Sequence, residues 1–240
     1  TVRLIEEPQA AFYDFLGAQG DAIADTLAGA KLVLVVDVGG GTTDLTLLKV
    51  VEGEDGTPDL ERITVGGHLL LGGDNMDAAL AHHVLAKANR SNLDPSEWSA
   101  LLQSVRLAKE KLLGPDAPEE MVVSLQKRGS RLLGGTQSIA LTRAEVNELL
   151  VDGFIPKTGP GDVPQKNKRA GLTTLGLPYA TDPAIPRHVC AFLRRHTEGA
   201  KEVGANIRDG LPRPDLVLLN GGVFHAPALV ERLSEVFTHW

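Results

Sequence analysis

The sequence is poor in cysteine, in net positive charge and in long apolar stretches, and each shortage excludes a class of protein. Cys190 is its single cysteine, so no disulfide can form within the chain, and a reducing, cytoplasmic compartment is expected. No apolar run approaches the roughly 18 residues that a membrane span needs. The net charge of −7 predicts no basic surface for nucleic acid. We therefore expect neither a membrane nor a nucleic acid as a partner.

The 240 residues and the apolar content of 42% allow one large domain or two small ones with a sizeable core. The chain starts at Thr1, and its first segment reads as a strand entering a helix with no partner strand nearby, so we expect a piece of a longer protein. A long loop is expected over 154–179. Strands are expected at 2–5, 32–36, 45–51, 62–65, 121–126, 131–133, 137–140 and 215–219, and helices at 8–16, from 75, at 95–113, 142–151, 182–200 and 227–240.

Three glycine turns each follow an apolar strand or precede a helix: Gly39–Gly41, Gly72–Gly73 and Gly221–Gly222. Glycine lets backbone N–H groups point outward together and lets a phosphate approach without a Cβ in the way. A helix that starts after such a turn adds the positive end of its dipole. No Walker loop or dinucleotide fingerprint is present. The pattern therefore predicts phosphate binding through a hairpin rather than through a strand-to-helix loop.

Acidic residues flank the first of these turns in the stretch "DVGGGTTDL". Phosphates in enzymes usually arrive with Mg²⁺, which keeps several waters and takes one or two carboxylates. Asp37 and Asp44 could reach such a hydrated metal, and Thr42 and Thr43 offer hydroxyls to phosphate oxygens or to water. Taken alone, the same stretch is also compatible with a tight hairpin that carries solvated acids.

The stretch "DVGGGTTDLTLL" resembles the second phosphate-binding hairpin of the actin, hexokinase and heat-shock chaperone superfamily. The resemblance is greatest to the DnaK-type, seventy-kilodalton heat-shock chaperones. It continues in register through "LIEEPQAA", "HLLLGGDNMD", "RLAKEKLL", "LTRAEVNEL" and "LVLLNGGVFHAPALVERL". Six segments in the right order are far more specific than any one of them.

The resemblance implies an α/β fold of the actin-like ATPase (ribonuclease H-like) kind, with a mixed sheet flanked by helices and a smaller α+β subdomain. The chain would be the second lobe of the nucleotide-binding domain. Its base subdomain would comprise 1–71 and 155–240, and its upper subdomain 72–154. ATP or ADP with Mg²⁺ would lie between this lobe and a first lobe outside the chain. Client peptides and co-chaperones would be partners through other domains.

The resemblance also implies roles for individual residues. Glu7 matches the catalytic glutamate that orients the attacking water or the waters of the metal, and Asp37 and Asp44 match the acids near Mg²⁺. The residues that match nucleotide contacts are Gly39, Gly40, Gly41, Thr42 and Thr43 at the phosphates, Gly72 and Gly73 at a further phosphate turn, Lys109 at the ribose, and Gly221 and Gly222 beneath the adenosine.

The residues expected around the nucleobase and the ribose depart from the family pattern. The family places a glutamate and an arginine one helical turn apart around the ribose and adenine, and here Arg106 and Glu110 reverse that order. The pair could still bridge at i,i+4, but it could not offer the ribose the same carboxylate. Val223 stands where the family has a serine, and His225 where it has the arginine that packs on adenine. Phosphate binding is therefore expected more firmly than adenine specificity.

These features predict an ATP-binding lobe of a chaperone ATPase that, taken alone, hydrolyses negligible ATP. An alternative is a nucleotide-binding or nucleotide-sensing scaffold without turnover. A third class, a small-molecule kinase of the same superfamily, shares the glycine hairpin but not "EEPQAA" or "TRAEV", and it ranks lowest.

Overall fold

A computed structural model describes residues 29–53, 58–126, 136–165 and 180–240, together with Ala10, Tyr13, Phe15, Gly17 and Leu27. The expected strands 2–5 and 131–133, Glu7 and most of the expected loop 154–179 therefore lie outside the described residues. The helix expected at 8–16 is described only at single positions.

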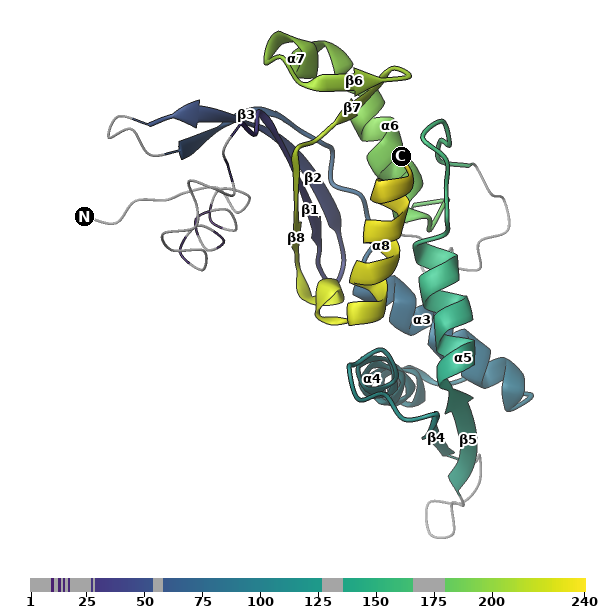
Figure 1. Cartoon of the computed structure of the whole chain (residues 1–240). Helices are drawn as coiled ribbons and strands as arrows, with labels where there is room; N and C mark the ends of the chain where they lie inside the picture. Colours follow the sequence, from purple (N-terminus) through teal and green to yellow (C-terminus); the bar gives the residue numbers. More distant parts are fainter. Residues whose placement is uncertain are drawn as a thin grey trace.

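The centre of the molecule is a four-stranded mixed sheet with the strand order β3-β2-β1-β8 (Figure 1). β1 (Leu32–Val38) runs antiparallel to β2 (Thr43–Glu52) and parallel to β8 (Leu216–Asn220), and β3 (Pro58–Val65) adds antiparallel to β2. β1 lies inside the sheet and is almost wholly buried. This confirms the expectation, drawn from its continuous apolar run, of a strand covered on both faces.

Alternate residues of β1 enter two different cores, as the period of two in a strand requires. Leu34 and Val36 join the main core, in which α6 (Ile185–Arg195) and α8 (Pro227–His239) also take part. Val33 and Val35 join a smaller core that also includes Leu27, Leu48 and Leu60. The end of β1 at Val38 therefore has firm packing on both sides, and this fixes the turn that follows it.

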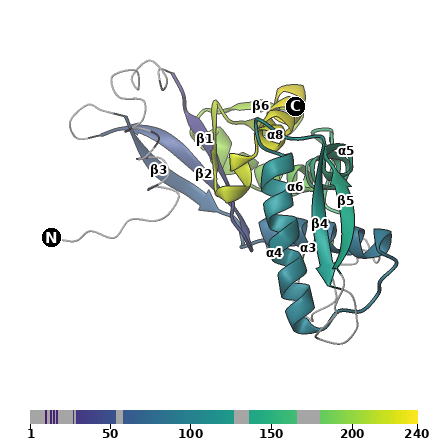
Figure 2. The same cartoon turned by 90° about the horizontal axis from the view of Figure 1, so that it is seen from below.

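A second group of elements lies at the end of the molecule opposite β6 (Asn206–Arg208) and β7 (Leu211–Arg213) (Figure 1). α4 (Pro95–Leu112) packs along the hairpin of β4 (Glu120–Gln126) and β5 (Thr136–Thr142) (Figure 2). Asp94 caps α4 by accepting hydrogen bonds from the N–H groups of Ser96 and Glu97, both at 2.9 Å. An aspartate directly before a proline that starts a helix is a typical N-cap. The other elements of this group are α3 (Gly73–Lys87), α5 (Arg143–Val146) and the π-helical turn η2 (Asn147–Asp152).

The helix expected over 182–200 begins only at Ile185, and it is interrupted once within the expected range. Pro186 lies in the first turn of α6, where its missing N–H is not needed. The break is at His196, between α6 and α7 (Thr197–Glu202). The expected elements also omitted a short hairpin of β6 (Asn206–Arg208) and β7 (Leu211–Arg213), because three-residue strands are too short to show a pattern. Among the described residues, no helix is long and apolar enough to cross a membrane.

Candidate functional site

The β1–β2 hairpin closes through the three-glycine turn. The N–H of Gly39 donates to the carbonyl of Thr42 at 2.9 Å. Asp37 and Asp44 are direct partners across the two strands, so their side chains lie on the same face of the sheet. The acids that flank the glycines in sequence are therefore neighbours in space.

Each of the two carboxylates is held by a neighbour. Asp37 accepts a hydrogen bond from the side-chain amide of Asn220, the last residue of β8, at 2.8 Å. Asp44 accepts one from the hydroxyl of Thr42 at 3.0 Å and is hydrogen-bonded to Nδ1 of the exposed imidazole of His68. These contacts orient the two carboxylates at the same end of the sheet.

The start of α3 is docked on the back of the glycine turn. The N–H groups of Gly73 and Asp74 donate to the carbonyls of Gly39 and Gly40 at 3.0 and 2.7 Å. A Cβ on Gly72 would lie 2.5 Å from the Gly40 oxygen and 2.7 Å from the Gly39 oxygen. Glycine at position 72 is thus required by the close approach of two backbone segments, and the second glycine turn supports the first.

Thr43 has a structural role in this arrangement. It is fully buried, and its hydroxyl donates to the carbonyl of Leu71 at 2.7 Å. That bond ties β2 to the segment before α3. The one hydrogen of the Thr43 hydroxyl is used in this contact.

The third glycine turn begins with a residue in a conformation that favours glycine. Gly221 has φ of +93°, and a Cβ there would lie 2.7 Å from Oδ1 of Asp37. The chain then forms the short 3₁₀ helix η3 (Gly222–His225) before α8 begins. Gly221 therefore lets β8 turn sharply beside the β1–β2 hairpin.

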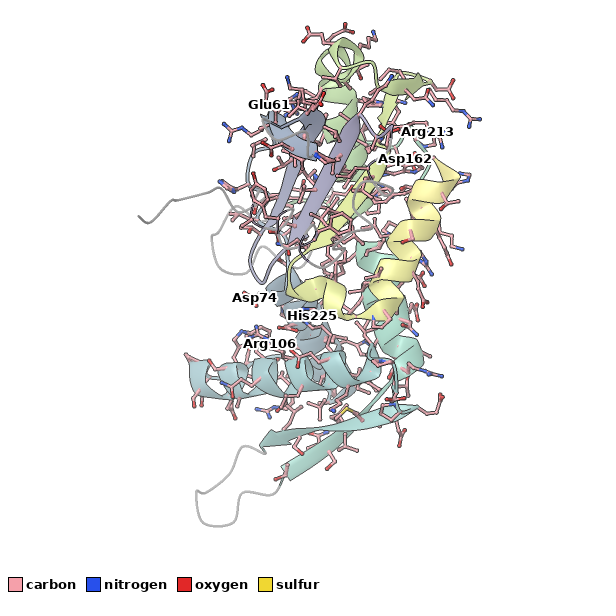
Figure 3. All side chains as sticks on the ribbon, turned by 60° about the vertical axis from the view of Figure 1, so that its left-hand side comes forward. Glu61, Asp74, Arg106, Asp162, Arg213 and His225 are labelled. Carbon is pink, nitrogen blue, oxygen red and sulfur yellow. The ribbon has the colours of Figure 1, made fainter. Side chains whose placement is uncertain are left out.

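A cleft of about 320 Å³ opens where the hairpin turn, α3, α4 and η3 meet. Asp74, Arg106 and His225, which come from three of these four segments, gather there in Figure 3. The volume is in the range of small-molecule sites. The residues that line the cleft are Gly39, Gly40, Gly73, Asp74, Met76, Asp77, Arg106, Lys109, Glu110, Leu113, Gly222, Val223, His225, Ala226 and Leu229.

One wall of the cleft is a network of four charges between α3 and α4. The buried carboxylate of Asp77 binds Nε of Arg106 at 2.7 Å and Nζ of Lys109 at 2.6 Å. Arg106 also reaches Asp74 through Nη2 at 2.6 Å. The hydrogen bond from Arg106 to Asp77 and the charge of Asp77 raise the pKa of the guanidinium. Both cations are thus held in place before any ligand arrives.

The cleft brings together predicted site residues from four separate motifs, but several other predicted site residues do not line it. Asp37, Gly41, Thr42, Thr43, Asp44, Gly72 and Gly221 lie around the hairpin without lining the cleft. The sequence reasoning missed Asp74 and Asp77, which fix Arg106 and Lys109. Their spacing of three on a helix, which places both on one face, was the available signal.

The residues near the hairpin fit a hydrated magnesium ion. Among the described residues, no group of three or more His, Cys, Asp or Glu side chains forms a ready-made metal cage. Mg²⁺ does not need such a cage, because it keeps several waters and uses one or two carboxylates with the phosphates of its nucleotide. The oriented pair Asp37 and Asp44 has that composition. A bound Mg²⁺ would neutralise phosphate charge there.

This geometry defines an α/β protein whose mixed sheet carries a glycine-lined cleft at one end. A sequence model described as Hsp70 protein matches residues 1–160. Since this is more than half of the 240 residues, the chain belongs to the Hsp70 protein family, which confirms the resemblance. The segment 216–233, which contributes β8, η3 and the start of α8, lies beyond the matched residues.

Curated relatives in this family include two proteins named "Chaperone protein HscA homolog". The one from Burkholderia multivorans is 38% identical over 135 residues, which is 55% of this chain and 19% of that protein. The one from Pseudomonas aeruginosa (strain LESB58) is 33% identical over 161 residues, or 65% and 21%. The chain thus spans about a fifth of the length of the relatives it matches.

Proposed function

We propose that this chain is the second lobe of an actin-like nucleotide-binding domain, and that it holds the phosphates and Mg²⁺ of a nucleoside triphosphate in a chaperone ATPase. The observation that carries the proposal is the cleft, in which the glycine hairpin, the start of α3, α4 and η3 meet. Membership of the Hsp70 family supports ATP as the nucleotide. No single motif would support this as well as their convergence does.

Each residue of the site has a physical role in the proposal. Backbone N–H groups over 40–42 hold phosphate oxygens, as glycine-rich turns do. Lys109, held on Asp77, adds positive charge to the cleft. Asp37 and Asp44 hold the waters of Mg²⁺. Glu7, which lies outside the described residues, is proposed to orient the attacking water. Positioning and charge stabilisation suffice for phosphoryl transfer, since the reaction needs little covalent help from the protein.

We propose that residues 1–71 and 155–240 form the base of the lobe and that 72–154 form its upper part. The docking of α3 on the glycine turn supports this, because it couples the two parts at the site. Closure on ATP with a first lobe would then signal to domains that bind client peptides or co-chaperones. A cytoplasmic location fits the one cysteine, Cys190, which is free and buried.

The test is ATP turnover by the longer protein that contains this chain. Asp44→Asn and Glu7→Gln should each lower turnover by at least about a hundredfold, the usual scale for losing a catalytic positioning or charge-stabilising group. Glu202→Gln, which changes an exposed glutamate of α7 outside the cleft, should leave turnover unchanged. Full activity in both site variants would refute the proposal. The 240-residue chain alone should show negligible turnover.

A second candidate is a nucleotide-binding scaffold without turnover. The observation that favours it is Arg106, which Asp74 and Asp77 hold where the family has a glutamate. Calorimetry with ATP, ADP and AMP separates the candidates when it is combined with the turnover assay. Binding that requires the β-phosphate, without hydrolysis by the longer protein, would favour the scaffold.

A further inference from the structure

The carboxylate of Asp74 lies against the glycine turn of the β1–β2 hairpin. A Cβ added to Gly40 would be 3.6 Å from each of its two oxygens, and the N–H of Asp74 donates to the Gly40 carbonyl at 2.7 Å. The proposed function places phosphate oxygens at this turn. A carboxylate that stayed there would repel a phosphate, because both groups are negatively charged. The Asp74 side chain must therefore move when a phosphate binds.

The group that holds Asp74 at the turn is the guanidinium of Arg106. Its Nη2 binds Asp74 at 2.6 Å and its Nε binds Asp77 at 2.7 Å, and Asp74 and Arg106 lie side by side in Figure 3. The two carboxylates differ in exposure, since 62% of the Asp74 side chain is exposed but only 1% of the Asp77 side chain. A buried charge is costly to leave without its partner, whereas an exposed one turns into water at little cost. The bond to Asp77 is thus the fixed anchor of Arg106, and the bond to Asp74 is exchangeable.

Lys109 places a second cation beside the same turn. Its Nζ would lie 3.6 Å from a Cβ on Gly73, and it binds Asp77 at 2.6 Å. Arg106 and Lys109 are three residues apart on α4, so they share one face of the helix, and both line the cleft together with Gly40. The glycine turn is therefore faced by two cations that one buried carboxylate holds in place.

We propose that Arg106 binds the β-phosphate of the nucleotide, and that Asp74 holds the same guanidinium nitrogen until the phosphate replaces it. The inference rests on the proposed function, because it takes the β-phosphate to lie on the glycine turn. A phosphate presents its oxygens in the geometry that the planar guanidinium binds, and it carries more charge than one carboxylate. Arg106 is then paired both in the empty and in the occupied cleft. Asp74 lowers the affinity for nucleotide, and Arg106 raises it.

The experiment measures the dissociation constant of ADP with Mg²⁺ by calorimetry, for the longer protein that contains this chain and for its variants. Asp74→Asn should bind ADP about fivefold more tightly, because an exposed ion pair no longer competes for Arg106. Arg106→Gln should bind ADP about tenfold more weakly, the scale of a hydrogen bond to a charged group. In the double variant the gain from Asp74→Asn should disappear, because without Arg106 nothing holds the carboxylate at the turn.

AMP separates the β-phosphate from the rest of the nucleotide, because it has the same base and ribose. Its dissociation constant should change by less than about twofold in each variant. Lys111→Gln and Asp116→Asn are the matched controls, because both residues are exposed and neither lines the cleft. Both controls should keep the parental affinity for ADP, and thermal melts check that all variants fold.

Three results would overturn the inference while leaving the proposed function intact. One is an unchanged affinity for ADP in Asp74→Asn or in Arg106→Gln. Another is an equal change for AMP and ADP, since Arg106 would then act on the ribose or the base. The third is a gain from Asp74→Asn that survives in the double variant, since Asp74 would then only repel the phosphate. A parent protein that binds no ADP would instead refute the proposed function, and the inference with it.

Discussion

Gly72→Ala tests how the glycine turn is supported. The new Cβ would lie 2.5, 2.7 and 2.8 Å from backbone atoms of Gly39 and Gly40, and no flexible side chain can move to relieve these contacts. Gly72 has φ of −168°, which any residue adopts, so the effect is purely steric. Overpacking of this kind costs about 1–3 kcal/mol. The two hydrogen bonds from the start of α3 to the turn add about 1 kcal/mol each if they are lost.

We therefore expect Gly72→Ala to lower the free energy of unfolding by about 3–5 kcal/mol if both hydrogen bonds are lost. Urea denaturation measures this directly, and Tm should fall by about 6–20 °C for a chain of this size. Gly67→Ala is the matched control, because its Cβ would meet nothing within 4 Å, and it should change stability little. A Gly72→Ala variant within about 0.5 kcal/mol of the parent would refute the close approach.

Two further predictions concern carboxylates outside the cleft. Burial favours a higher pKa for Glu145, but hydrogen bonds from Lys87, Thr142 and His83 outweigh it and lower the pKa to about 2. Glu145→Gln should therefore lower the free energy of unfolding by about 1–2 kcal/mol at neutral pH, allowing for the partial exposure of the side chain. That cost should vanish as the pH falls from about 4.5 toward 2, and a pH-independent cost in urea titrations would contradict the assignment. Asp182 is buried and forms an ion pair with Arg187 at 3.0 Å. Asp182→Asn should therefore lower the free energy of unfolding by about 3 kcal/mol. An unchanged urea midpoint would refute a stabilising role for this ion pair.

β1, β2 and the glycine hairpin between them could be predicted because their determinants are local. An apolar run, a glycine turn and a second apolar run predict β1 and β2 without reference to the rest of the chain. Asp94 and Thr142 could be predicted as caps for the same reason, since both bonds of a capping box join residues three apart.

The charged wall could not be predicted, because it depends on how two helices pack. Arg106 is 29 residues from Asp77 and 32 from Asp74, and nothing in the sequence sets the angle between α3 and α4. The role of Thr43 could not be predicted either. Its position beside the glycine turn suggests a contact to phosphate, but Thr43 is buried and its hydroxyl donates to the carbonyl of Leu71.

The central claim is that the glycine hairpin holds nucleotide phosphates beside Asp37 and Asp44. A crystal structure of the chain with saturating ADP and Mg²⁺ tests it most directly. The account predicts the β-phosphate against the backbone N–H groups of residues 40–42, with the metal's waters on the two carboxylates. A diphosphate bound elsewhere on the chain, or a base seated on the hairpin, would contradict it.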